Sequence, residues 1–113
     1  MKNEKEDGLR LLTRTEELIL LAVWRLKENA YCVPIRAEIS EITGEKWSLG
    51  SVYMPLDRLV KKGFLDSYLS EATPERGGRQ KRIYTLTREG LKALEKIRAV
   101  QSRMWNGIPE LVE

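Results

Sequence analysis

The chain has 113 residues, of which 42% are hydrophobic and 33% are charged, and its formal net charge is +3. These values are typical of one globular domain with a single modest core. The chain contains no histidine, which excludes a Ser-His-Asp triad and a Cys-His pair. Its one cysteine, Cys32, leaves too few donors for a zinc site, and no phosphate-binding glycine motif is present. We therefore expect a protein that is not an enzyme and holds no metal or cofactor.

Nothing in the sequence predicts a membrane protein. The longest apolar run, Leu18–Trp24, is far shorter than the roughly 20 residues that a membrane-spanning helix needs. The first residues lack a signal-peptide pattern, and a single cysteine favours a reducing compartment. The expected location is the cytoplasm.

The first predicted helix follows a flexible arm over residues 1–12. Thr13 and Glu16 form a capping box at its start, and the helix should run to about residue 28. Apolar residues cover nearly its whole circumference, which is typical of a helix buried on more than one side. We expect a second chain or an additional helix to cover its outer face.

Two further helices are predicted, joined by a short turn. Pro34 suits the first turn of one and Gly44 suits its end. Ser48 can cap the next helix, which should end near Lys62 with Gly63 just beyond it. This layout matches a helix-turn-helix, and an ordinary corner between two helices is the alternative.

A basic hairpin is predicted after these helices. Residues 64–70 and 81–86 read as strands, and the Gly77-Gly78 pair between them favours a turn with positive φ. Residues 46–92 carry ten Lys or Arg against five acids, so positive charge gathers in this part of the chain. The predicted fold is mainly α with a small β-hairpin, a winged helix-turn-helix. The cations of the wing are Arg76, Arg79, Lys81 and Arg82.

A long C-terminal helix completes the prediction. Thr87 should cap it, and the Asn106-Gly107 pair should end it. Its apolar residues step by three or four, and the winged core does not need so long a helix. We expect its stripe to form a dimer against the first helix, although packing on its own core is the competing view. The chain thus divides into an arm (1–12), a DNA-binding domain (13–87) and a dimerisation helix (88–113).

Two segments resemble the PadR family of bacterial transcriptional regulators, in its short form. One is Ser48–Leu59 with Gly63-Phe64-Leu65, and the other is Gly78–Gly90 with its Tyr-x-Leu-Thr strand. The chain departs from the family pattern at Tyr31-Cys32, where the family often has Tyr-Gly, and this puts the geometry of that loop in doubt.

The resemblance implies a dimeric repressor whose two recognition helices enter successive major grooves of a pseudo-palindromic operator in double-stranded DNA. It also implies a contact of the Tyr53 hydroxyl with phosphate and release by a planar aromatic or phenolic effector. A winged helix that binds only proteins is the alternative function. The predicted DNA contacts are Ser48, Leu49, Ser51, Tyr53, Arg58, Lys61, Arg76, Gly77, Gly78, Arg79, Lys81 and Arg82. The predicted homodimer interface is Leu20, Trp24, Leu94, Ile97, Met104, Trp105 and Ile108. The candidate ligand site is Trp105, Met104 and Trp24, and ordinary packing within the interface is the alternative for these three residues.

Overall fold

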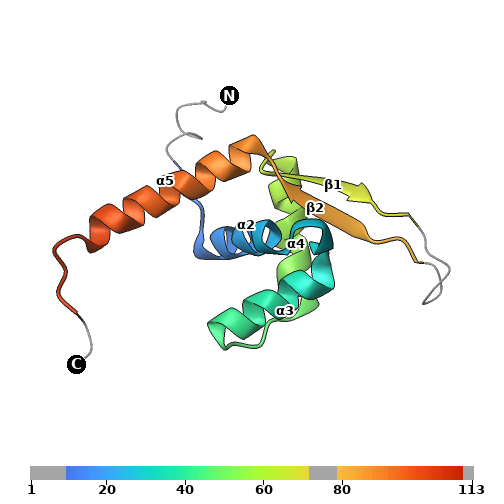
Figure 1. The fold of residues 1–113 in the computed structure, drawn as a ribbon, viewed down its shortest axis with the longest axis horizontal. Coiled ribbons are helices and arrows are strands. Elements are labelled where there is room, and N and C mark those ends of the chain that lie inside the picture. Colours follow the sequence, from blue (N-terminus) through green and yellow to red (C-terminus); the bar gives the residue numbers. More distant parts are fainter. Residues whose placement is uncertain (1–9, 72–78, 111–113) are drawn as a thin grey trace.

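The computed structural model describes residues 10–71 and 79–110, and within these ranges the chain folds into four helices and one hairpin (Figure 1). The predicted winged helix-turn-helix is confirmed. The helix-turn-helix and the hairpin lie toward one end of the molecule, and the last helix extends toward the other. The elements are α2 (Arg14–Leu26), a 3-10 turn (Lys27–Asn29), α3 (Cys32–Thr43), α4 (Leu49–Lys61), β1 (Leu65–Leu69), β2 (Arg82–Leu86) and α5 (Arg88–Trp105).

Three helices begin at the capping residues that the sequence predicts. The Thr13 hydroxyl accepts from the Glu16 amide at 3.1 Å, and the Glu16 carboxylate accepts from the Thr13 amide at 2.8 Å. Ser48 caps α4 and Thr87 caps α5 in the same way, through side-chain oxygens that accept backbone N–H groups. Helix α3 begins at Cys32, so Pro34 lies in its first turn as predicted, where the N–H group that proline lacks needs no intrahelical partner.

The hairpin is held to the helices at its base. Strands β1 and β2 pair antiparallel, with Leu65 opposite Leu86 and Leu69 opposite Arg82. The amide of Tyr84 donates to the carbonyl of Ala30 at 2.8 Å, which joins β2 to the segment after α2. The predicted turn at residues 77 and 78 lies outside the described residues.

Helix α2 occupies the centre of the core, between the other helices and the hairpin. Ile19 and Leu20 have no exposed surface, and they pack with Ile35 of α3 and Leu56 of α4. Leu20, a predicted dimer-interface residue, is already enclosed by its own chain, so its side chain has no exposed surface to offer a partner. Of the exposed α2 residues, Trp24 retains 54% of its surface.

Helix α5 packs on the core along its first three turns, and Gln101 in the fourth turn still donates to the Glu17 carboxylate of α2 at 3.2 Å. Leu94 and Ile97, which are also predicted dimer-interface residues, are buried in the single chain, whereas the predicted interface residues Met104 and Trp105 in the last turn are 73% and 58% exposed. Gly107, with φ of 83°, follows the helix end at the predicted place. Within residues 10–71 and 79–110, no helix combines the length and apolar character needed to span a bilayer.

Candidate nucleic-acid interface

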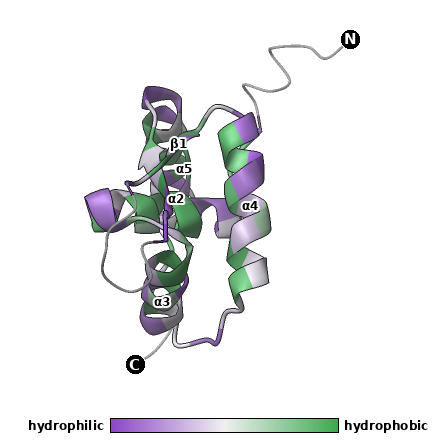
Figure 2. Cartoon of the chain, turned by 90° about the vertical axis from the view of Figure 1, so that its right-hand side faces the viewer, coloured by the Kyte–Doolittle hydropathy of each residue, from purple (hydrophilic) through white to green (hydrophobic). Residues whose placement is uncertain are grey.

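Helix α4 forms one side of the molecule and buries only one of its faces. Val52, Leu56 and Leu59 have no exposed surface and attach the helix to the core. The opposite face remains exposed along the whole helix. In Figure 2, the half of α4 next to the connection from α3 is mostly pale or green, and strong purple appears in its other half.

The two serines at the start of α4 are engaged in capping the helix. The Ser48 hydroxyl accepts from the Ser51 amide at 3.1 Å and donates to the Ser51 hydroxyl at 3.2 Å. The Ser51 hydroxyl donates to the Ser48 carbonyl at 2.8 Å. Both residues are exposed, so their remaining lone pairs face solvent. Either hydroxyl must rotate out of this cap before it can donate to a phosphate.

Two large side chains near the start of α4 project into solvent. Leu49 is 48% exposed and Tyr53 is 55% exposed. Tyr53 is therefore not a core tyrosine, and its hydroxyl is accessible to a ligand. Leu49 does not belong to the hydrophobic core that the described residues form.

The cations at the far end of α4 have different surroundings. Lys61 forms an ion pair with Asp57 at 3.1 Å, and Arg58 is exposed. Lys62 lies 2.6 Å from a carboxylate oxygen of Glu16 and so joins α4 to the cap of α2. Burial alone would raise the pKa of Glu16, but hydrogen bonds from Lys62 and the Thr13 amide outweigh it and hold the pKa below its usual value of 4.5.

The described part of the wing presents three cations on or beside β2. Arg79 is exposed, and it has no ion-pair partner among the described residues. The Lys81 ammonium lies 4.7 Å from the centroid of the Tyr31 ring, and the Arg82 guanidinium donates to the Ser67 hydroxyl at 3.0 Å. The predicted contacts Arg76, Gly77 and Gly78 lie outside the described residues.

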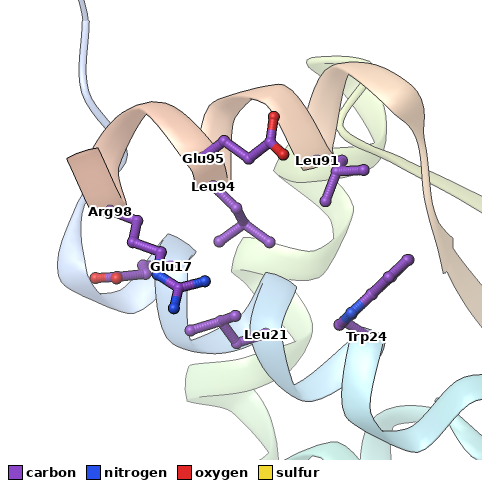
Figure 3. A pocket seen from close by; sticks show the side chains of 7 residues that line it. All are labelled: Glu17, Leu21, Trp24, Leu91, Leu94, Glu95 and Arg98. Atoms are coloured by element: carbon purple, nitrogen blue, oxygen red, sulfur yellow. The ribbon is translucent and has the colours of Figure 1, made fainter. Parts of the chain in front are cut away.

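A hollow of about 410 Å³ lies between α2 and α5, and we call it the α2–α5 hollow. Of the three candidate ligand residues only Trp24 lines it, since Met104 and Trp105 lie further along α5. A single chain thus does not assemble the candidate ligand site. Figure 3 shows Leu21 and Trp24 of α2 facing side chains from α5. The lining residues are Glu17, Leu21, Trp24, Leu91, Leu94, Glu95 and Arg98.

The cysteine and the acidic residues provide no reactive or metal-binding centre in the described ranges. The Cys32 thiol is half-buried, 3.9 Å from the Leu49 carbonyl, and burial raises its pKa. A thiol with a raised pKa carries little thiolate at neutral pH and reacts slowly. No group of three His, Cys, Asp or Glu side chains within residues 10–71 and 79–110 could hold a metal ion.

One exposed residue of α4 was missing from the predicted DNA contacts. Met54 is 58% exposed, more than Leu49 or Tyr53 on the same helix. Its spacing from the buried residues of α4 could have revealed it, because Met54 falls between Val52 and Leu56 and so on the opposite face of a helix.

Comparisons with known proteins agree with this geometry. Residues 20–96 match the model of the transcriptional regulator PadR-like family. No curated protein matches the chain significantly. Among solved structures, RosR of H. salinarum is 27% identical, with a TM-score of 0.67, and the match covers 88% of this chain and 83% of that one.

Two further structures are similar. A PadR family transcription regulator from hypervirulent Clostridium difficile is 27% identical, with a TM-score of 0.58, over 85% of this chain and 91% of that chain. A transcriptional regulator from Clostridium thermocellum shares the fold, with a TM-score of 0.68 at 21% identity, over 100% and 99% of the two chains.

Proposed function

Because this chain belongs to the PadR-like family of transcriptional regulators, we propose that it is a homodimeric repressor that leaves its operator when a small ligand binds. Proteins of this family are DNA-binding regulators and not enzymes. The repressor acts on a pseudo-palindromic site in double-stranded DNA, in the cytoplasm. Repression, dimer formation and ligand release are the parts of this proposal that experiments must test.

The exposed face of α4 is the observation that carries the proposal. A helix that is buried on one side and exposed along the other, next to a cationic hairpin, has the arrangement that lets a recognition helix enter a major groove. Tyr53 and the serines at its start contact phosphates or base edges, and Arg58 and Lys61 position the far end against the backbone. Arg79 enters the adjoining minor groove from the wing.

The uncovered apolar surface supports a dimer. Trp24 is 54% exposed, Trp105 at the end of α5 is 58% exposed, and Ile108 just beyond the helix is 51% exposed. Together with Met104 they would leave a large apolar area in water in a single chain. A second copy that lays its own α5 against α2 buries Met104, Trp105 and Ile108 and covers part of the Trp24 side chain.

The α2–α5 hollow supports release by a ligand. Its volume of about 410 Å³ is that of a small-molecule site, and Trp24 offers an indole face to a planar aromatic or phenolic compound. A ligand in this hollow changes how α5 lies on α2 of the same chain, and so moves the part of α5 that contacts the second copy. Such a shift alters the separation of the two recognition helices and lowers their affinity for two half-sites of fixed spacing.

Duplex binding and association state together test the proposal. An operator is selected from random DNA, its affinity is followed by fluorescence anisotropy across a salt series, and mass is measured by sedimentation. We expect a dimer that protects two half-sites separated by about 34–36 Å. A monomer that ignores duplex DNA even at low salt would refute the proposal. A stable dimer without DNA affinity would favour the protein-binding alternative.

Ligand binding is tested with tryptophan fluorescence and a panel of planar cations and phenolic acids. We expect quenching in the wild type and in Trp47→Phe, because Trp47 lies in the connection between α3 and α4 and does not line the hollow. The signal should be lost in Trp24→Phe. An unchanged response of Trp24→Phe, or no response in any variant, would remove this hollow as the effector site.

A further inference from the structure

We propose that Met54 reads base sequence in the operator, by packing its side chain against the 5-methyl group of a thymine in the major groove. This inference rests on the proposed function, since it names the chemistry by which α4 tells one half-site from another. Met54 is thereby a specificity-determining residue.

Met54 lies at the centre of the face of α4 that points away from the core. Gly50, Met54, Asp57 and Lys61 follow one another at helical spacing and form one stripe. The buried stripe of Val52, Leu56 and Leu59 begins two residues after Gly50. A step of two residues is about 200° around the helix axis, so the two stripes lie on opposite faces. The residue at the middle of the outer stripe is therefore the one that a helix in a groove directs at the bases.

The first turns of α4 lack every side chain that makes a bidentate contact with a purine. Residues 49–57 contain no Arg, Lys, Asn or Gln, which excludes the common readout of guanine and adenine in this part of the helix. What remains for reading bases is apolar contact, the hydroxyls of the serines and of Tyr53, and the carboxylate of Asp57, which is already paired with Lys61. The apolar contact that distinguishes one base from another in the major groove is with the thymine methyl group.

The neighbours of Met54 in the outer stripe favour a close approach to the bases. One turn earlier, Gly50 has no side chain, and a Cβ added there would meet only the Ser48 hydroxyl at 4.0 Å. The backbone can therefore come near the duplex at this point. One turn later, the Lys61 ammonium lies 3.1 Å from the Asp57 carboxylate and offsets part of the repulsion between this carboxylate and phosphates. Between these residues, a flexible thioether at 58% exposure can reach the groove floor.

Replacing thymine with uracil tests the inference, because it removes only the methyl group. With the selected operator, each thymine of a half-site is replaced in turn, and the dissociation constant is measured by anisotropy. We expect one position at which the wild type loses affinity about fourfold, the value of one buried methyl group. At that position Met54→Ala should bind thymine and uracil operators equally.

Ile42→Ala is the matched control, since it also removes an exposed apolar side chain, but from α3 and outside the predicted DNA contacts. It should keep the fourfold preference for thymine. Both positions are exposed, so both variants should melt like the wild type. Binding without any uracil effect, or with the same effect in Met54→Ala, would overturn this inference alone. Absence of any duplex binding would overturn the proposed function and this inference with it.

Discussion

Gly90 should be one of the least replaceable residues of the chain. It lies in the first turn of α5, and a Cβ there would overlap the carbonyl oxygen of Phe64 and lie 2.8 Å from Cδ1 of Leu86. The Phe64 carbonyl cannot easily move, because it accepts from the Thr87 amide at 3.1 Å. Overpacking of this kind costs roughly 1–3 kcal/mol, and the better helix propensity of alanine returns at most about 1 kcal/mol. We expect Gly90→Ala to lower the free energy of unfolding by about 2 kcal/mol.

Gly50→Ala provides the matched control for this prediction. Gly50 also lies in the first turn of a helix, but its added Cβ would meet only the Ser48 hydroxyl at 4.0 Å. Its stability should stay the same or rise by up to about 1 kcal/mol. Thermal melts followed by circular dichroism should separate the variants, with Gly90→Ala melting roughly 10 °C below the wild type. Equal melting temperatures for Gly90→Ala and the wild type would refute the packing argument.

Three other predictions follow from named contacts. Hydrogen bonds from Lys62 and Thr13 outweigh the effect of burial and hold the pKa of Glu16 below 4.5, so the contribution of the Glu16–Lys62 pair to stability is complete at neutral pH and is lost as pH falls through 4.5 and below. In urea melts, Glu16→Gln should lose less stability than the wild type over this pH range. An equal loss in both proteins would contradict the assignment. Thr87→Ala removes a cap and a donor to the Gly63 carbonyl at 2.7 Å, and denaturant melts should show a loss of about 1–2 kcal/mol. Arg79→Ala should reduce the slope of log affinity against log salt by about one; a slope identical to that of the wild type would exclude Arg79 from the DNA contacts.

Much of the fold was predictable because local chemistry determines where the elements begin and end. Thr13, Ser48 and Thr87 are short polar residues just before apolar periodic segments, and each accepts a backbone N–H as predicted. Gly44 adopts the left-handed conformation that ends α3. Each of these helix ends depends on residues within four positions of one another, so its place can be predicted without knowledge of tertiary packing.

Features that depend on which helices meet could not be read from the sequence. Leu20 and Trp24 are both apolar residues of one helix, yet Leu20 has no exposed surface and Trp24 keeps 54%. The pattern of α2 is apolar nearly all round, and only the positions of its neighbours decide which side is left uncovered. The role of Gly90 is equally non-local, since its constraint comes from Phe64, and the whole hairpin lies between these two residues in the sequence.

The segment after α4 meets the start of α5 at one junction, which fixes the recognition helix, the wing and the proposed dimerisation helix relative to one another. The segment after α4 contributes the Gly63 and Phe64 carbonyls, which accept from the side chain and the amide of Thr87 at the start of α5. Gly90 then lets α5 lie directly against Phe64. The recognition helix, the wing and the proposed dimerisation helix therefore meet within a few residues. If α5 joins two copies, the angle set here determines how far apart the two α4 helices lie. A substitution that strains this junction, such as Gly90→Ala, should change the spacing of half-sites that the dimer prefers. Loss of the Arg79 side chain should instead lower the affinity for DNA at every spacing.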